Sequence, residues 1–495
     1  MAMDILDRFV QAGASYQRDV AVAHLDVPPG EGRVARLADA LQRSAEVCTV
    51  NELHALQHAM AEAPAASQAA LQRLLAWGRE MSLRGVALPH QRDMQARQRS
   101  MTCVVDEETI PFLASFAAMA AETRRDRRAA IEAAVVEQLE EHHSLFEAQY
   151  AALHRASEAL DYASLAAVWE AIVPVDLTAQ HDEAVRLLAE TQEVYSDLLA
   201  WAVKQRLHVP LGRLRRHDIL ALFTFPEYQQ YYQPGEVPSA LQHCLHDMGI
   251  DPHADGRLTL RQCPPVFGLP TAVAVEIPAE VVLTSSQVSG LQAAEAYASA
   301  YGRALLWAYT SPEFPLVTRL VGDEALPTSS AQLFAEMIAL PAWLRHYLGI
   351  RVDTNYRPWR RLDRLYRLRR QLGRLLYAQH VATADSLAGA PEAYREIMMD
   401  ACLVDYHPAY YLVDWDWTYT SVALVRGWKL AYSLLDTLRQ HYAVDWFRNP
   451  ESGPWLKAFW QSALGENPDE LLKHLGGVPW DATLFGEFLM HDEMW

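Results

Sequence analysis

The stretch from residue 291 to residue 309 reads LQAAEAYASAYGRALLWAY, and it decides the fold. It follows a segment rich in β-branched residues, and its many small residues predict a long helix. Two polar residues, Ser299 and Arg303, stand among small and apolar neighbours. Three further residues form a small-residue frame around them: Gly302, Ala304 and Leu305.

The composition is that of a folded, acidic protein. The chain has 495 residues, of which 51% are hydrophobic, so it can bury a large core. Its formal net charge of −19 argues against nonspecific binding to nucleic acid or to an anionic membrane, because both need a basic surface. We therefore expect neither nucleic acid nor a membrane among its partners.

Cysteine usage and the first residues indicate a cytoplasmic protein. The five cysteines are far apart and form no Cys-x-x-Cys pair, which predicts reduced thiols. The opening MAMDILDRFVQ carries Asp4, Asp7 and Arg8 inside its only apolar run, so we expect no signal peptide. The sequence contains no uncharged apolar run long enough to predict a membrane span.

The pattern along the chain is mainly helical. Residues 1–210 are rich in Ala, Leu, Glu, Gln and Arg, with apolar residues at three- and four-residue spacing. We expect helix breaks at Pro64 and near Pro89, and a boundary at 208–212. Four segments fit amphipathic helices: 32–61, 64–83, 106–160 and 178–206.

The only convincing β region lies at residues 257–285. RLTLRQC alternates apolar and polar residues, while TAVAVEIP and EVVLTSS are rich in β-branched residues. Proline and glycine separate these runs, so we expect two or three short antiparallel strands. Helices are expected to resume at about residue 287 and to continue to the end.

Residues 351–380 carry nine arginines on or beside one predicted helix. Either a phosphate or nucleic-acid site, or a solvated face paired with acidic residues, would explain them. The acidic net charge favours the solvated face.

Two later segments extend the pattern that begins at residue 291. Gly322 and Asp323 precede a predicted helix, in which Thr328 follows Arg303 by 25 residues and Gln332 lies one turn further on. Closer to the C-terminus lies a segment rich in aromatic and acidic residues: His407, Tyr410, Tyr411, Asp414, Trp415, Asp416, Trp417 and Tyr419.

These three segments resemble, in order and spacing, the M3 family of zinc metallopeptidases, the thimet oligopeptidase and oligoendopeptidase F group. Members have a helix reading roughly His-Glu-x-Gly-His-Ala-Leu, a Glu on the next active-site helix as third zinc ligand, and a His/Tyr-rich segment that faces the zinc. The resemblance covers roughly residues 255–490. It implies a mainly α, zincin-like architecture, with a large helical body, a deep cleft and one small antiparallel β region. We expect an N-terminal helical region, 1–210, and a peptidase-like region, 211–495, in one continuous body.

Under this resemblance, the residues that carry zinc chemistry are replaced. The two His positions hold Ser299 and Arg303, the general base is Ala300, and the third ligand is Thr328. Hydroxyl groups are poor zinc ligands at neutral pH, and an arginine cannot be one. A guanidinium about 4 Å from a bound cation would cost roughly 4 kcal/mol for each unit of charge. We therefore predict no metal and no cofactor at this site.

Two roles are open for Arg303. It can form a salt bridge that fills the metal position, with Glu295, Asp323, Glu324, Glu336 or Asp414 as partner. Alternatively, it can hold a carboxylate of a bound ligand in a bidentate contact. The candidate ligand-binding residues are therefore Arg303, Ser299, Thr328 and Gln332.

The C-terminal segment supplies the best acid–base set in the chain, because carboxylates beside aromatic residues often have shifted pKa values. The candidate catalytic residues are Asp414, Asp416, His407, Tyr410, Tyr411 and Tyr419. The sequence thus supports three hypotheses. The first is a metal-free pseudopeptidase that binds a peptide or small molecule in the inherited cleft. The second is a repurposed enzyme that performs metal-independent acid–base chemistry on a small molecule there. The third is a structural subunit whose cleft is filled.

Overall fold

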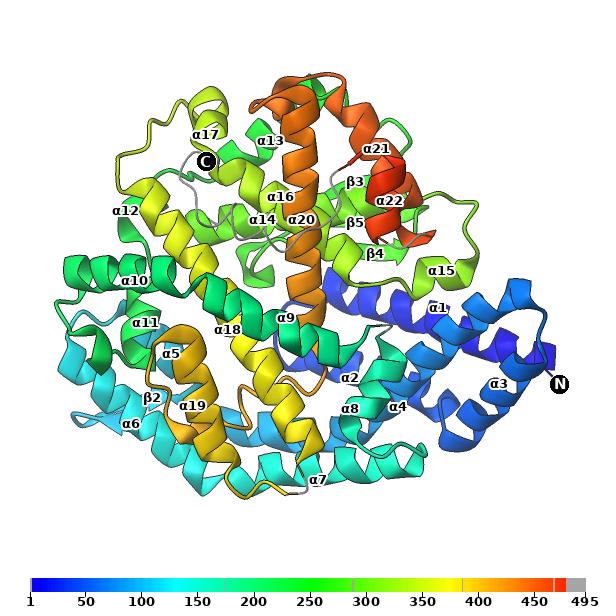
Figure 1. The fold of residues 1–495 in the computed structure, drawn as a ribbon, viewed down its shortest axis with the longest axis horizontal. Coiled ribbons are helices and arrows are strands. Elements are labelled where there is room, and N and C mark those ends of the chain that lie inside the picture. The colour runs from blue at the N-terminus through cyan, green and yellow to red at the C-terminus, as the bar shows by residue number, and fades with distance from the viewer. Residues whose placement is uncertain (1, 174, 287–288, 385, 466–467, 478–495) are drawn as a thin grey trace.

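Two long helices, α18 (Tyr356–Thr383) and α20 (Thr420–Tyr442), run through the centre of the molecule and connect its two halves (Figure 1). The structure is a computed structural model that describes residues 2–173, 175–286, 289–384, 386–465 and 468–477. Helices dominate these residues and the sheets are small, which confirms the mainly α fold class. Within the described part of the chain, no helix is both long and apolar enough to cross a membrane.

The N-terminal half is a layered set of helices. Helix α4 (Ala65–Ser100) begins directly after Pro64, as predicted, but it continues through Pro89, where we expected a break. Helices α9 and α10 pack against α18, so the N-terminal region contacts the C-terminal one. The other helices of this half are α1 (Ala2–Asp26), α2 (Glu31–Val47), α3 (Val50–Glu62), α5 (Phe112–Ala121), α6 (Arg125–Glu141), α7 (His143–Ala159), α8 (Leu165–Ile172), α9 (Leu177–Glu190) and α10 (Gln192–Arg206).

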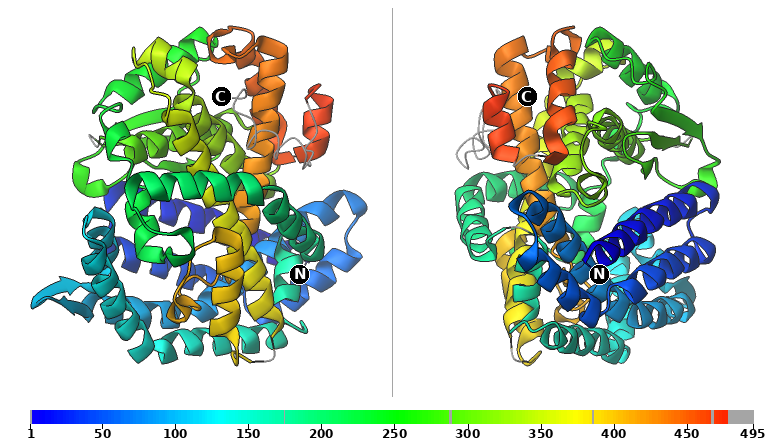
Figure 2. Two further views of the ribbon diagram at one scale, coloured as in Figure 1. Left: turned by 60° about the vertical axis from the view of Figure 1, so that its left-hand side comes forward. Right: turned by 90° about the vertical axis from the view of Figure 1, so that its right-hand side faces the viewer.

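A β-hairpin interrupts the N-terminal helices, which corrects the helix predicted over 106–160 and the view that 257–285 is the only β region. Strands β1 (Thr102–Val105) and β2 (Glu108–Pro111) pair in an antiparallel register, and Figure 2 shows the hairpin projecting from the body. The turn is made by Asp106 and Glu107, both with positive φ. Such turns usually read Asn-Gly or Asp-Gly, and here Glu107 takes the place of the glycine, so the turn signal in the sequence is weak.

The predicted region 257–285 forms a three-stranded sheet in the order β3-β5-β4. Strands β4 (Ala272–Glu276) and β5 (Glu280–Ser285) are antiparallel, as expected. Strand β3 (Leu258–Gln262) is parallel to β5, which corrects the fully antiparallel arrangement. Strand β4 lies at an edge of the sheet, and α1 packs against it (Figure 1).

Helix α14 (Leu291–Tyr309) follows the sheet and confirms the long helix predicted there. It packs against α16 (Ala325–Ala339), which in turn packs against α20. The remaining helices surround this group: α11 (Arg216–Leu222), α12 (Pro226–Gln229), α13 (Glu236–Asp247), α15 (Leu316–Leu320), α17 (Pro341–Tyr347), α19 (Ala390–Cys402), α21 (Ser452–Ser462) and α22 (Pro468–His474). Short 3₁₀ helices lie at Leu211–Arg213, Pro265–Phe267, Pro408–Tyr410, Trp446–Arg448 and Ala463–Gly465. All five cysteines are free and buried.

Candidate functional site

Glycines bring α14, α16 and α20 unusually close together. A Cβ at Gly302 would lie 2.2 Å from the carbonyl oxygen of Ser330 on α16. A Cβ at Gly427 of α20 would lie 2.5 Å from Cγ2 of Thr328. Real Cβ atoms do not approach other atoms this closely, so both positions require glycine unless the helices move apart. Gly302, which the sequence pattern singled out, and Gly427, which it did not, therefore fix the spacing of the helices that carry the candidate site.

The structure brings Arg303 and Thr328 into contact. Nη2 of Arg303 donates to Oγ1 of Thr328 at 3.3 Å, across the α14–α16 junction. Nη1 of Arg303 forms an ion pair with Glu324, one of the partners predicted for it. The Arg303 guanidinium also lies 5.6 Å from the ring centre of Trp307, one turn further along α14. The side chain of Arg303 remains 26% exposed, so a ligand can reach it.

Ser299 and Gln332 lie one turn away from this contact and line a small cavity of about 60 Å³. Nε2 of Gln332 donates to Oε1 of Glu336 at 2.7 Å. Ala300, which the M3 resemblance aligns with the general base, is buried and offers only a methyl group. The four positions that the M3 resemblance singled out therefore lie at one helix junction. They carry two hydroxyls, a methyl group and a guanidinium, from Ser299, Thr328, Ala300 and Arg303.

An ion cluster surrounds the small cavity. Glu295 of α14 pairs with both Arg360 and Arg367 of α18. Burial opposes ionisation of Glu295, but these two guanidinium groups outweigh it and lower the pKa of Glu295 to about 2. Glu336 pairs in the same way with Arg364. The arginine-rich helix thus pairs with acidic residues, as predicted, but the expectation of a solvated face was wrong: Arg360, Arg361, Arg364 and Arg369 are all buried.

A larger cavity of about 450 Å³ is lined by Arg303 itself. Its walls come from α1, α4, the edge strand β4, α14, α15 and α16. Nε2 of Gln17 on α1 donates to the carbonyl oxygen of Ala274 at 3.3 Å, so this carbonyl points away from β5 towards the cavity side. Trp77 and Trp307 add aromatic surface. The cavity therefore combines a strand edge, aromatic surface and the Arg303 guanidinium.

The predicted acid–base set lies elsewhere. Asp414 accepts hydrogen bonds from Arg370 at 3.1 Å and from Tyr394 at 2.7 Å, and Arg216 lies 3.7 Å away. Burial raises the pKa of Asp414, but Arg216 and Arg370 outweigh it and keep the pKa below its ordinary value. Asp414 is therefore an ionised centre of a buried ion network.

The neighbours of Asp414 are engaged in local structure. Asp416 accepts hydrogen bonds from the backbone N–H groups of Thr420 and Ser421 at the start of α20. Nδ1 of His407 accepts from Ala409 N at 3.2 Å, which starts a 3₁₀ turn.

The three tyrosines of the predicted acid–base set also have local structural contacts. The ring of Tyr410 lies 3.8 Å from the Arg216 guanidinium, Tyr411 donates to Glu147 at 3.1 Å, and Tyr419 has a positive φ at the start of α20. None of the six predicted catalytic residues lines either cavity beside Arg303.

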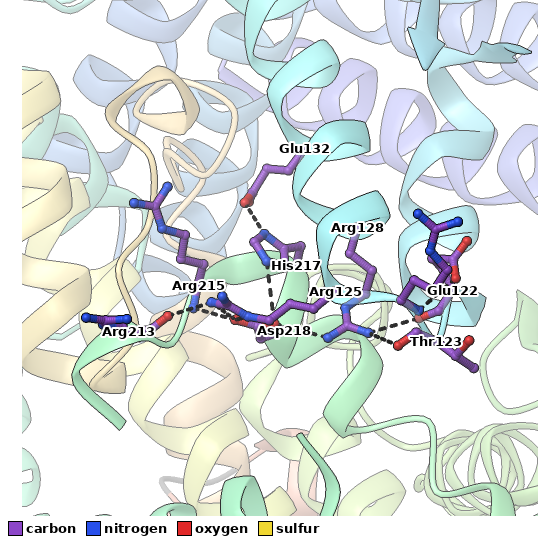
Figure 3. Close-up of polar contacts among 10 residues, drawn as sticks. Glu122, Thr123, Arg125, Arg128, Glu132, Arg213, Arg215, His217 and Asp218 are labelled. Atoms are coloured by element: carbon purple, nitrogen blue, oxygen red, sulfur yellow. Dashed lines mark hydrogen bonds and ion pairs between the residues drawn. The ribbon is translucent and has the colours of Figure 1, made fainter. Parts of the chain in front are cut away.

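Sequence reasoning missed a buried cluster centred on His217 and Asp218 (Figure 3). Nδ1 of His217 lies 2.6 Å from Oε2 of Glu132, and Asp218 is bound by both Arg125 and Arg128. Burial raises the pKa of Asp218, but the hydrogen bonds from Arg125 and the charges around it lower the pKa overall. The cluster joins α6 to α11 and lines neither of the two cavities described above. Its members come from distant parts of the chain, and no sequence spacing connects them.

The fold and the helix junction define a class of protein: a mainly helical, zincin-like peptidase fold. Among solved structures, the chain is similar to Pyrococcus furiosus carboxypeptidase in an apo-Mg form, with a TM-score of 0.57 and 13% sequence identity. The match covers 99% of this chain and 98% of that one, so it extends over both halves of the molecule. At this identity the likeness shows the fold alone. No sequence-family model matches the chain, and no curated protein matches it by sequence.

The residues at the α14–α16 junction do not fit a catalytic zinc ion. Zinc needs imidazole, thiolate or carboxylate ligands and an open position for water. Ser299, Arg303 and Thr328 supply none of these groups, and the Arg303 guanidinium occupies the junction. Within the described ranges, no group of three or more His, Cys, Asp or Glu side chains is arranged to hold a metal.

Proposed function

We propose that this chain is a pseudopeptidase related to the M3 zinc peptidases, which binds a peptide or another small ligand beside Arg303 without zinc hydrolysis. The observation that carries the proposal is the hydrogen bond between Arg303 and Thr328. In the M3 pattern these two positions hold the second zinc-binding His and the zinc-binding Glu. Their contact supports the alignment and puts a fixed positive charge near the metal position.

The replacement removes each part of the zinc mechanism. A guanidinium keeps its proton and repels a dication, and the hydroxyls of Ser299 and Thr328 bind zinc weakly. Ala300 cannot take a proton from a water molecule. Hydrolysis needs the ligands, the open position and the base together, so the loss of all of them argues against residual zinc proteolysis.

The cavity of about 450 Å³ supports ligand binding. Its volume is in the range of small-molecule sites, which are commonly about 300–1,000 Å³. Strand β4 lies at the sheet edge and lines the cavity, so its free backbone groups can pair with an extended peptide. Gln17 occupies one of these groups, the Ala274 carbonyl, and would have to release it.

Acid–base catalysis by the Asp414 segment has less support. The carboxylate of Asp414 is held by Arg216, Arg370 and Tyr394, and that of Asp416 by backbone N–H groups. Neither carboxylate lines the cavity beside Arg303.

Three measurements test the proposal. Equilibrium dialysis of the full chain against zinc, followed by elemental analysis, should give less than one zinc per chain, and hydrolysis of an internally quenched peptide should stay at the rate of a zinc-free control. Calorimetric titration with acetyl-Gln-Phe should detect binding that weakens in Arg303→Gln. Stoichiometric zinc lost in Thr328→Val, or zinc-dependent cleavage, would refute the proposal.

A further inference from the structure

Arginines from three separate elements line the cavity beside Arg303. Arg84 comes from α4, Arg303 from α14 and Arg319 from α15. In a chain with a net charge of −19, three guanidinium groups around one cavity are a local concentration of positive side chains. Guanidinium groups bind carboxylates and phosphates through paired N–H donors, so their convergence points to an anionic ligand.

Arg84 and Arg303 have ion-pair partners, but both pairs are partly exposed to solvent, so both guanidinium groups can bind a ligand. Arg84 pairs with Glu80 one helical turn away, and both side chains are partly exposed, at 37% and 27%. The partner of Arg303, Glu324, is 56% exposed. Exposed pairs of this kind contribute little stability, so a ligand can replace them at low cost.

Arg319 is held differently. Its Nε donates to the carbonyl oxygen of Phe314 at 3.0 Å, and its Nη1 donates to that of Ile277 at 2.6 Å. Among the described residues, no carboxylate forms an ion pair with it. The two carbonyls orient the guanidinium but do not neutralise it, so its charge remains for a ligand.

The acidic residues of the cavity equal these arginines in number, but one of them is engaged elsewhere. Three carboxylates line it, from Glu80, Asp323 and Glu324. Asp323 is already bound by Arg426 through two hydrogen bonds, at 3.1 and 2.6 Å, and it also interacts with Arg73. Burial and the nearby Arg33 lower the pKa of His24, the remaining basic group of the wall, which keeps it neutral. Among the described residues, the wall therefore carries three arginines and three carboxylates, but Asp323 is neutralised from outside the wall, so Arg84, Arg303 and Arg319 face only Glu80 and Glu324.

The rest of the wall is apolar. Trp77 and Met81 of α4 and Trp307 of α14 line the cavity together with Ile277 and Leu320. A ligand that only offered charge would leave this surface in contact with water, whereas an aromatic or branched group would cover it.

From these observations we propose that the cavity binds a ligand with two negative charges and an aromatic or branched apolar body. Arg303 pairs with one negative charge, Arg319 and Arg84 pair with the other, and the tryptophans enclose the apolar part. This inference rests on the proposed function and adds the chemical class of the ligand. Two carboxylates on a short peptide and one phosphate on an aromatic ring share this chemistry.

Calorimetric titration of the full chain with matched probes tests the inference. Acetyl-Glu-Phe carries two carboxylates, acetyl-Gln-Phe carries one in nearly the same shape, and phenyl phosphate carries a dianionic phosphate. We expect acetyl-Glu-Phe or phenyl phosphate to bind at least about tenfold more tightly than acetyl-Gln-Phe, because one charge-assisted contact is lost. Preference for acetyl-Glu-Phe assigns the charges to carboxylates, and preference for phenyl phosphate assigns them to a phosphate.

Variants separate the two proposals. Arg319→Gln and Arg84→Gln should each weaken the preferred dianion about tenfold and change acetyl-Gln-Phe binding little. Arg395→Gln removes an exposed arginine that pairs with Asp405 outside the cavity, and it should change neither. If Arg319→Gln fails to fold because two carbonyls lose their donor, Arg84→Gln still carries the test. Equal affinity for acetyl-Glu-Phe, phenyl phosphate and acetyl-Gln-Phe would overturn the dianion inference and leave ligand binding intact. Absence of binding for every probe at millimolar concentration would overturn both.

Discussion

Gly302 of α14 lies so close to Ser330 of α16 that a Cβ on Gly302 would come within 2.2 Å of the Ser330 carbonyl oxygen. The opposing atoms belong to the backbone of a buried helix and cannot rotate away. Gly302→Ala should therefore force α14 and α16 apart and lower the free energy of unfolding by about 3 kcal/mol, the cost of overpacking a tight core. Urea denaturation followed by circular dichroism measures this loss.

Gly212 provides the matched control for that substitution. No atom lies within 4 Å of a Cβ placed there, so Gly212→Ala should leave the urea midpoint nearly unchanged. If Gly302→Ala were as stable as Gly212→Ala, the close approach of α14 to α16 would be wrong.

The helix junction could be predicted because its signal is local. The small residues around Gly302 favour a helix with a narrow face, and the M3 resemblance, with its 25-residue spacing, put Arg303 and Thr328 at one site, where the structure has them in contact. The first property depends on residues close in sequence, and the second on two helices that follow each other with only the short α15 between them.

The features that sequence reasoning missed depend on distant residues. The Arg360 side chain is buried because Glu295, which lies 65 residues earlier on α14, supplies its counter-charge. Arg319 became part of the cavity only through the carbonyl of Ile277, which the chain path brings beside α15. The parallel pairing of β3 with β5 is likewise set by tertiary packing, because both pairing directions accept the same β-branched residues.

Glu295 should make the stability of the protein depend on acid pH. The ordinary pKa of this carboxyl is 4.5, and Arg360 and Arg367 lower it to about 2 in the folded state despite burial. A folded-state pKa below the unfolded one means that the ionised carboxylate stabilises the fold above pH 4.5. This contribution is lost as the pH falls from 4.5 towards 2. Glu295→Gln should lower stability at pH 7 by about 3 kcal/mol, because the buried Arg360 loses one of its two carboxylate partners among the described residues and keeps only Asp363, 3.5 Å away.

The pH profile distinguishes this ion pair from a packing effect. Thermal unfolding from pH 7 to pH 3 should show a smaller acid-induced loss in Glu295→Gln than in the parent chain. Glu31→Gln removes a carboxylate that pairs with Arg99 on the surface and is 77% exposed, so it should leave the acid profile of the parent. An unchanged profile in Glu295→Gln would contradict the role of Glu295.

Loss of the Asp218 carboxylate from the cluster in Figure 3 should strongly lower the stability of the protein. Asp218 is fully buried and binds Arg128, which is 3% exposed. Asp218→Ala leaves this guanidinium unpaired inside the protein and should cost about 3 to 5 kcal/mol. Asp126→Ala removes an exposed partner of Arg124 from the same region and should leave the melting temperature unchanged. Similar melting temperatures for the two variants would mean that water enters the cluster.

The strongest test of the junction is to rebuild a zinc site in it. A four-residue variant, Ser299→His, Ala300→Glu, Arg303→His and Thr328→Glu, restores the ligands and the base of the M3 pattern. Because α14 and α16 keep their spacing through Gly302, these side chains should converge, and the variant should bind zinc where the parent chain does not. Elemental analysis after dialysis against zinc measures the stoichiometry.

A three-residue version that keeps Arg303 is the control for this design. It carries Ser299→His, Ala300→Glu and Thr328→Glu. The Arg303 guanidinium therefore remains at the junction and repels a dication. Zinc bound by the four-residue variant and not by the three-residue one would identify Arg303 as the group that excludes the metal. Zinc bound equally by both would show that Arg303 can turn out of the junction. If the four-residue variant folds but binds none, the alignment of Arg303 and Thr328 with two zinc ligands is wrong.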